Sequence, residues 1–76
     1  MNNYEELTLL LNEKRYIDFI NTINEMNVVD TADFLMTIDI QELPKVFRML
    51  KKDVAADIFA ELDSELQQQI IEAMQD

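Results

Sequence analysis

The sequence predicts an all-α protein of about six short helices, from three observations. Glycine is absent and Pro44 is the only proline among the 76 residues, so the chain lacks the turn residues that β-hairpins need. Helix-favouring Leu, Ala, Glu, Gln and Lys are plentiful. Apolar residues also recur at helical spacing, as Val54, Ile58 and Leu62 do. The length fits one domain over residues 1–76.

The first two helices are expected over Tyr4–Asn12 and Tyr16–Met26, with Lys14 and Arg15 between them. The glutamates of the first turn favour a helix start there, since carboxylates stabilise helix N-termini. Each segment has one apolar face: Leu7, Leu10 and Leu11 on the first, and Phe19, Ile20, Ile23 and Met26 on the second.

A third helix is expected over Thr31–Thr37, because Asp30 is a favourable N-cap. Asp39 and Glu42 then form the capping-box pattern of a fourth helix. A proline inside that helix would remove a hydrogen bond, so we expect a turn over 39–43 and a regular helix from near Pro44 to Leu50. The apolar residues of the two helices are Phe34, Leu35, Ile38, Val46, Phe47 and Leu50.

A fifth helix is expected over Asp53–Asp63, and Asp63 is expected to cap a sixth. The sixth carries Leu66, Ile70, Ile71 and Met74 toward the chain end. A solenoid ends in a polar capping unit, and this apolar face has only three glutamines to cover it. We therefore expect the natural domain to continue beyond Asp76, which would make this chain truncated.

The second half of the chain repeats the first with a shift of 24 residues. Caps, alanines and apolar pairs move together: Ala56–Phe59 falls on Ala32–Leu35, Leu62–Asp63 on Ile38–Asp39, and Ile70, Ile71 and Met74 on Val46, Phe47 and Leu50. Such a period predicts three two-helix hairpins stacked as a solenoid. The alternative is an ordinary helical bundle whose apolar spacing imitates a repeat.

The composition excludes several classes of function. Sixteen Asp and Glu against six Lys and Arg give a formal charge of −10, which repels nucleic acids and anionic lipid and attracts cations or basic proteins. Without Cys or His there are no disulfides, thiolate sites or usual zinc sites, and the cytosol is the expected compartment. No run is apolar enough for direct membrane insertion.

Catalysis has little support in the residues. Ser64 is the only serine, lies where a helix should begin and has no histidine to activate it, so we predict a non-enzyme. A hydrolase that uses paired carboxylates would need a concave pocket around them.

The sharpest candidate site is a row of carboxylates four residues apart, at Asp53, Asp57 and Glu61. Like charges at this spacing cost about 0.2–0.5 kcal/mol per pair on an isolated helix, which favours a visiting cation. Magnesium keeps several waters and usually takes one or two carboxylates, so the row supplies half of a weak Mg²⁺ site shared with another surface. Ala56 and Ala60 leave room for that surface. The alternative is a solvated acidic face.

The segment FRMLKKDVAADIFAELDSELQQQIIEAM resembles the cytosolic N-terminal domain of MgtE-type magnesium transporters, whose repeats follow F-R-L-L-P-K-x-x-A-A-E-V-F-x-x-L-D-P-E-x-Q. The likeness covers about residues 31–76, and Ser64 replaces the family's second proline. The middle domain of the flagellar motor switch protein FliG is a more distant likeness. The resemblance implies a right-handed superhelix, and it matches Asp57 to an acidic residue that contributes to a Mg²⁺ site in the family.

The resemblance also implies partners. In that family the domain closes onto a CBS-type domain through Mg²⁺ and so regulates the membrane domain of the same transporter, with homodimers formed only through domains missing here. The expected function is therefore a regulatory Mg²⁺ sensor on the cytosolic side of the membrane. The alternative is a FliG-like solenoid that docks a basic protein without metal; cation dependence distinguishes the two.

Overall fold

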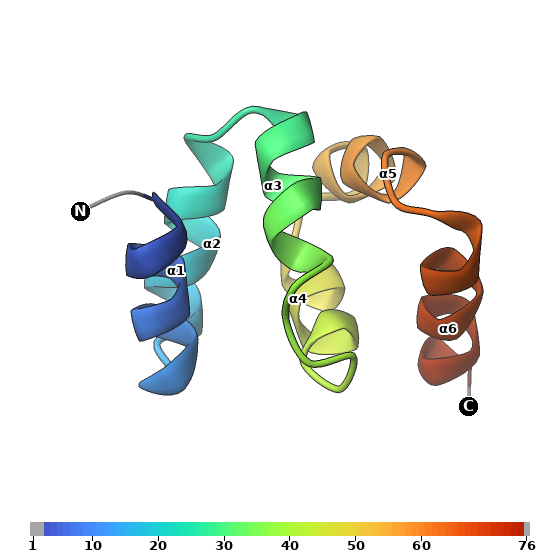
Figure 1. Cartoon of the computed structure of the whole chain (residues 1–76), viewed down its shortest axis with the longest axis horizontal. Helices are drawn as coiled ribbons and strands as arrows, with labels where there is room; N and C mark the ends of the chain where they lie inside the picture. Colours follow the sequence, from blue (N-terminus) through green and yellow to red (C-terminus); the bar gives the residue numbers. More distant parts are fainter. Residues whose placement is uncertain (1–2, 76) are drawn as a thin grey trace.

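The computed structural model describes residues 3–75, and within them the fold is all-α with no strand (Figure 1). Met1, Asn2 and Asp76, the ends of the expected 1–76 domain, lie outside the described residues. The six helices are α1 (Asn3–Asn12), α2 (Tyr16–Asn24), α3 (Val28–Leu35), α4 (Leu43–Met49), α5 (Lys52–Ala60) and α6 (Ser64–Met74). The predicted fold class and the six predicted helices are confirmed.

The helices follow one another along an elongated body of 34 × 22 × 21 Å, with α1 and α2 at one end and α6 at the other (Figure 1). The main contacts join α1 to α2, α2 to α4, α4 to α6 and α3 to α5. Beyond the first pair, each helix thus packs mainly on its equivalent in the next repeat. The expected second and third hairpins are therefore held together by their neighbours more than by internal contacts.

The core is one cluster that runs through all six helices. Phe34 of α3 lies at its N-terminal end, with its ring centroid 6.1 Å from that of Phe19 and 5.3 Å, edge to face, from that of Tyr4. Aromatic pairs of this geometry add about 0.5–1.5 kcal/mol each to the area they bury. The predicted inner faces are buried at Leu7, Leu10, Leu11, Phe19, Ile20, Ile23, Phe34, Leu35, Val46, Phe47, Leu50, Ile58, Leu62 and Ile70.

The third helix begins three residues before the predicted start, and the predicted cap Asp30 is wrong. Asn27 is the N-cap: its side-chain oxygen accepts from the Asp30 N–H at 2.8 Å, and its amide donates to the Asp30 carboxylate at 2.9 Å. Asp30 instead stabilises the first turn, where a carboxylate faces the positive helix end. The earlier start places Thr31, Ala32 and Leu35 together in the core.

The fourth helix confirms the expected turn and start, within one residue, but not the capping box. A turn precedes Leu43, and Pro44 occupies the first helical turn, where its missing N–H costs nothing. Asp39 accepts from the Gln41 N–H at 2.9 Å and so stabilises the turn instead of capping the helix. Glu42 makes no side-chain cap bond because its carboxylate points to other partners.

The last two helices are close to their predicted bounds. Helix α5 ends at Ala60, three residues before the predicted end, and Glu61 is its C-cap. The predicted cap of α6 is confirmed, since the Asp63 carboxylate accepts from the Leu66 N–H at 2.8 Å. Helix α2 ends at Asn24, two residues before the predicted end, and Met26 is half-buried in the turn that follows.

The 24-residue period is present in the positions of the helices. Helices α3 and α5 begin 24 residues apart, at Val28 and Lys52, each after an N-cap of extended backbone. The two caps differ, because Asn27 makes a side-chain cap bond and Lys51 makes none. The effects of mutating the equivalent N-caps Asn27 and Lys51 can therefore be compared directly.

We predict that Asn27→Ala lowers the free energy of unfolding by about 1 kcal/mol, because the first turn of α3 loses its side-chain acceptor. Lys51→Ala is the matched control and should change stability by only a few tenths of a kcal/mol, since no cap bond is lost. Urea unfolding followed by circular dichroism measures both. Equal losses for the two variants would contradict this assignment of the caps.

Candidate functional site

The predicted acidic row lies along one exposed side of α5. Asp53 is in the first turn, Asp57 is one turn further, and Glu61 is the C-cap with near-helical backbone, so the three keep their i, i+4 order. All three side chains are exposed. Residues four apart on a helix have β-carbons about 6 Å apart, so neighbouring carboxylates can share one hydrated cation.

No lysine or arginine in residues 3–75 pairs with this row. The ion pairs there involve Lys14, Arg15 and Lys45, none of which contacts α5's carboxylates. Asp53 accepts from the Val54 N–H at 2.9 Å, which anchors it to the helix start. Glu61 lies beside the negative end of the helix dipole, so the field of the row is most negative toward the C-terminus of α5.

Asp57 differs from the other two because it borders a small cavity between α5 and the α2–α3 segment. The cavity, of about 120 Å³, is otherwise lined largely by apolar side chains, among them Ile23 and Ile58. Asn24, the last residue of α2, also lines the cavity. Asn24 could not be found by sequence reasoning, because it lies 33 residues from Asp57 and only the folded chain brings both residues to the same cavity.

The row is not a complete metal centre. Within residues 3–75 no group of three carboxylate side chains is gathered closely enough to hold an ion. The carboxylates lie in line along a helix instead of converging on one point. Any cation they attract would therefore keep water molecules or ligands from a second surface in its remaining positions.

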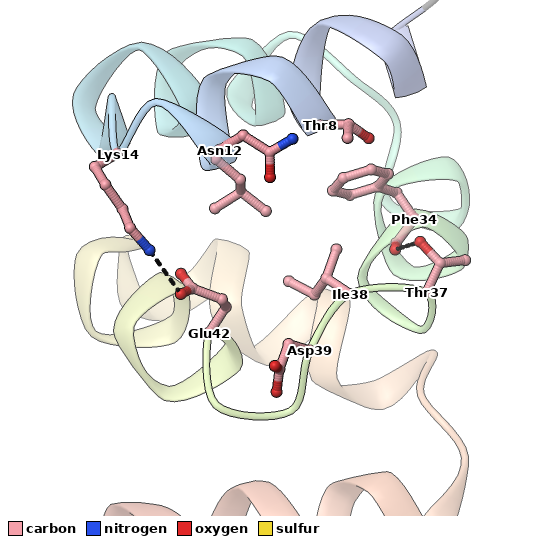
Figure 2. A pocket seen from close by; sticks show the side chains of 9 residues that line it. Thr8, Asn12, Lys14, Phe34, Thr37, Ile38, Asp39 and Glu42 are labelled. Carbon is pink, nitrogen blue, oxygen red and sulfur yellow. Dashed lines mark hydrogen bonds and ion pairs between the residues drawn. The ribbon is translucent and has the colours of Figure 1, made fainter.

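A separate polar cavity of about 380 Å³ lies between α1 and the turn that joins α3 to α4 (Figure 2). Figure 2 shows Lys14 extended toward Glu42 at one side and Phe34 and Ile38 at the other. Thr37 caps its own turn by donating to the Phe34 carbonyl at 2.6 Å. This cavity holds no residue of the predicted site.

Glu42, at the start of α4, lines this cavity and links the helix to Lys14 and Tyr16. Its carboxylate lies 3.4 Å from Lys14 Nζ and 3.8 Å from Lys45 Nζ, and it accepts from the Tyr16 hydroxyl at 3.2 Å. The charge of Glu42, and to a smaller extent Tyr16, raises the pKa of Lys14. A raised lysine pKa means that the pair stabilises the fold below the ordinary lysine pKa and loses this contribution as the pH rises through the raised value.

Lys14 is held in place by an unusual backbone. It has φ of 59°, the left-handed conformation that ends α1, while the Arg15 N–H bonds to the Leu10 carbonyl and the Lys14 N–H to the Leu11 carbonyl. This is the Schellman arrangement, in which glycine usually occupies the Lys14 position. A lysine there accepts a local cost of about 1 kcal/mol and gains the contact with Glu42.

The residues do not assemble a catalytic group in the described part of the chain. Ser64 is exposed at the first position of α6. The acidic row is an open helix side, and the one cavity that Asp57 borders is small and largely apolar. An exposed row of carboxylates attracts cations or a basic surface, and its role in binding stays a prediction.

We predict that Glu42→Gln lowers the pKa of Lys14 toward its ordinary value, because the charge that holds the proton is removed. The variant should also destabilise the fold slightly, since two solvent-screened ion pairs are lost and the Tyr16 hydroxyl bond is weakened. An NMR titration of the lysine side chains measures the pKa, with Lys51, which makes no ion pair within residues 3–75, as internal reference. An unchanged Lys14 pKa would contradict the contact.

No helix in the described part of the chain is both long and apolar enough to cross a lipid bilayer. Searches of curated proteins and of solved structures found no match to the chain. A family model does match: residues 26–76 correspond to the MgtE intracellular N domain. The matched segment is two thirds of the chain and contains α3 to α6 with the acidic row. The chain therefore belongs to the MgtE intracellular N domain family, a family of magnesium transporter domains and not of enzymes.

Proposed function

We propose that this chain is a regulatory Mg²⁺ sensor, in which the acidic side of α5 supplies half of a cation site and a second acidic surface supplies the other half. The observation that carries the proposal is the exposed row Asp53, Asp57 and Glu61, which has no cationic partner within residues 3–75. Membership in the MgtE intracellular N domain family supports magnesium as the cation.

The chemistry of Mg²⁺ fits an open row of this kind. The ion gives up its waters reluctantly and is usually bound by one or two carboxylates with several waters retained. Asp57 is the central ligand of the proposal, with Asp53 one turn before it and Glu61 one turn after it. The net charge of −10 adds a long-range attraction for divalent cations.

Regulation follows from sharing the ion between two surfaces. Two acidic surfaces repel each other without a cation, and Mg²⁺ between them favours the closed arrangement. The ion shifts the equilibrium only as far as it binds the closed state better than the open one. The second surface in this proposal is a CBS-type domain of the same transporter, and closure is passed to its membrane domain.

A titration of the 76-residue chain with MgCl₂, followed by backbone amide NMR, tests the half-site. We expect weak, millimolar binding, with shifts confined to residues 53–61 and absent when NaCl is added at the same ionic strength. Asp57→Asn should reduce these shifts severalfold. Asp33→Asn is the matched control, since Asp33 is the exposed residue 24 positions earlier on α3, and it should leave the shifts unchanged.

Two results would contradict the proposal. Shifts that follow ionic strength alone, equally with Na⁺ and Mg²⁺, would indicate a surface that docks a basic protein without metal. A tight site that survives Asp57→Asn would place the ion elsewhere on the chain.

A further inference from the structure

The C-terminal end of the fold carries an open apolar groove between α5 and α6. Its volume is about 440 Å³, and its walls include small alanines on α5 and large side chains around them: Ala55, Ala56, Phe59, Ile70, Ile71 and Met74. Ile71 and Met74 are 43% and 38% exposed. Phe47 of α4 also lines the groove, and α6 lies at one end of the fold (Figure 1).

Every one of these six residues has an equivalent 24 positions earlier that is buried. The equivalents are Thr31, Ala32, Leu35, Val46, Phe47 and Leu50. The contrast is greatest on the later helix of each repeat: Phe47 is 8% exposed and Leu50 7%, against the values for Ile71 and Met74 above. The groove is thus an open copy of a surface that is covered one repeat earlier.

What covers the earlier surface is visible in the same structure. Helix α5 packs on α3 and α6 packs on α4. The Phe59 ring stands edge to face with that of Phe47, with centroids 6.3 Å apart. The covering helices present aliphatic residues four apart, such as Val54 and Ile58 on α5 and Leu66 and Ile70 on α6.

We propose that the α5–α6 groove docks a two-helix unit of the same repeat type, with aliphatic residues at the positions equivalent to Val54, Ile58, Leu66 and Ile70. The groove and its occupied counterpart are lined by equivalent positions, so the same kind of helix pair fits both. Burying Ile71 and Met74 gives the apolar stabilisation that Phe47 and Leu50 already supply.

A second copy of this chain fits the groove poorly. Its own unit of this type, α5–α6, has those aliphatic residues packed on its α3 and α4, so they are not available to another molecule. The α1–α2 unit of a second copy does not fit either, because its first helix does not follow the repeat pattern. Two chains of charge −10 also repel each other. The occupant is therefore a helix pair of this repeat type that lies outside residues 1–76, and not the α5–α6 unit of a second copy.

The test uses this chain with a probe helix pair attached in register. Joining a copy of residues 53–76 directly after Asp76 keeps the 24-residue spacing and places the probe where the groove can receive it. We expect the extended protein to unfold in one transition at a higher temperature than the 76-residue chain, and Ile71 and Met74 to show NMR contacts with the added residues.

The decisive comparison is Met74→Glu in both proteins. It should raise the equilibrium constant for unfolding about tenfold or more in the extended protein, and less than about threefold in the 76-residue chain, where Met74 faces solvent. Ile17→Glu is the control, because Ile17 is 73% exposed far from the groove, and its small effect should be the same in both proteins.

Either of two results would overturn the proposal. One is an added segment that stays unfolded and leaves the Ile71 and Met74 signals unchanged. The other is dimerisation of the 76-residue chain in sedimentation experiments that Met74→Glu abolishes, since the occupant would then be a second copy.

Discussion

The structure depends on each repeat burying the apolar side of the one before it. Helices α3 and α4 pack on the first two helices through residues such as Phe34, and α5 and α6 then cover their remaining apolar side, where the Phe59 ring contacts Phe47. A chain this short buries only about 60% of the surface that it exposes when unfolded, so its stability is marginal and the stacking contributes a large part of it. The same constraint leaves the α5–α6 groove open, because nothing in the described chain follows it. The stability of the fold and the proposed docking at the α5–α6 groove thus both follow from the covering of one repeat by the next.

The fold class and the core residues could be predicted because the spacing of the apolar residues determines which segments are helices and which faces are buried. Stripes such as Leu7, Leu10 and Leu11 admit only a helix with that face inward. Helix ends were less predictable. Asp30 and Asn27 are both good caps by residue type, and the choice of Asn27 depended on which start brings Thr31 and Ala32 into the core. A cap contributes only about 1 kcal/mol, so the packing of the core decides which of two possible residues caps the helix.

The candidate site also has parts that could be predicted from the sequence and parts that could not. The acidic row could be predicted because its members are four apart on one helix, and their exposure follows from the apolar stripe beside them. Asn24 and the Lys14–Glu42 contact could not, because each joins segments that only the tertiary fold brings together. The left-handed Lys14 is a further case, since the sequence offers no glycine to mark that turn. Whether the repeats form a right-handed superhelix stays a prediction.

We propose that a divalent cation collects at one place, the row on α5, on a chain whose net charge is −10. Mn²⁺ can replace Mg²⁺ at oxygen sites, and its unpaired electrons broaden the NMR signals of nearby nuclei. Adding Mn²⁺ in amounts far below the protein concentration should broaden the amides of residues 53–61 first, ahead of those around Asp33 and Glu72. Equal broadening along every acidic segment, or broadening centred away from Asp57, would contradict the account.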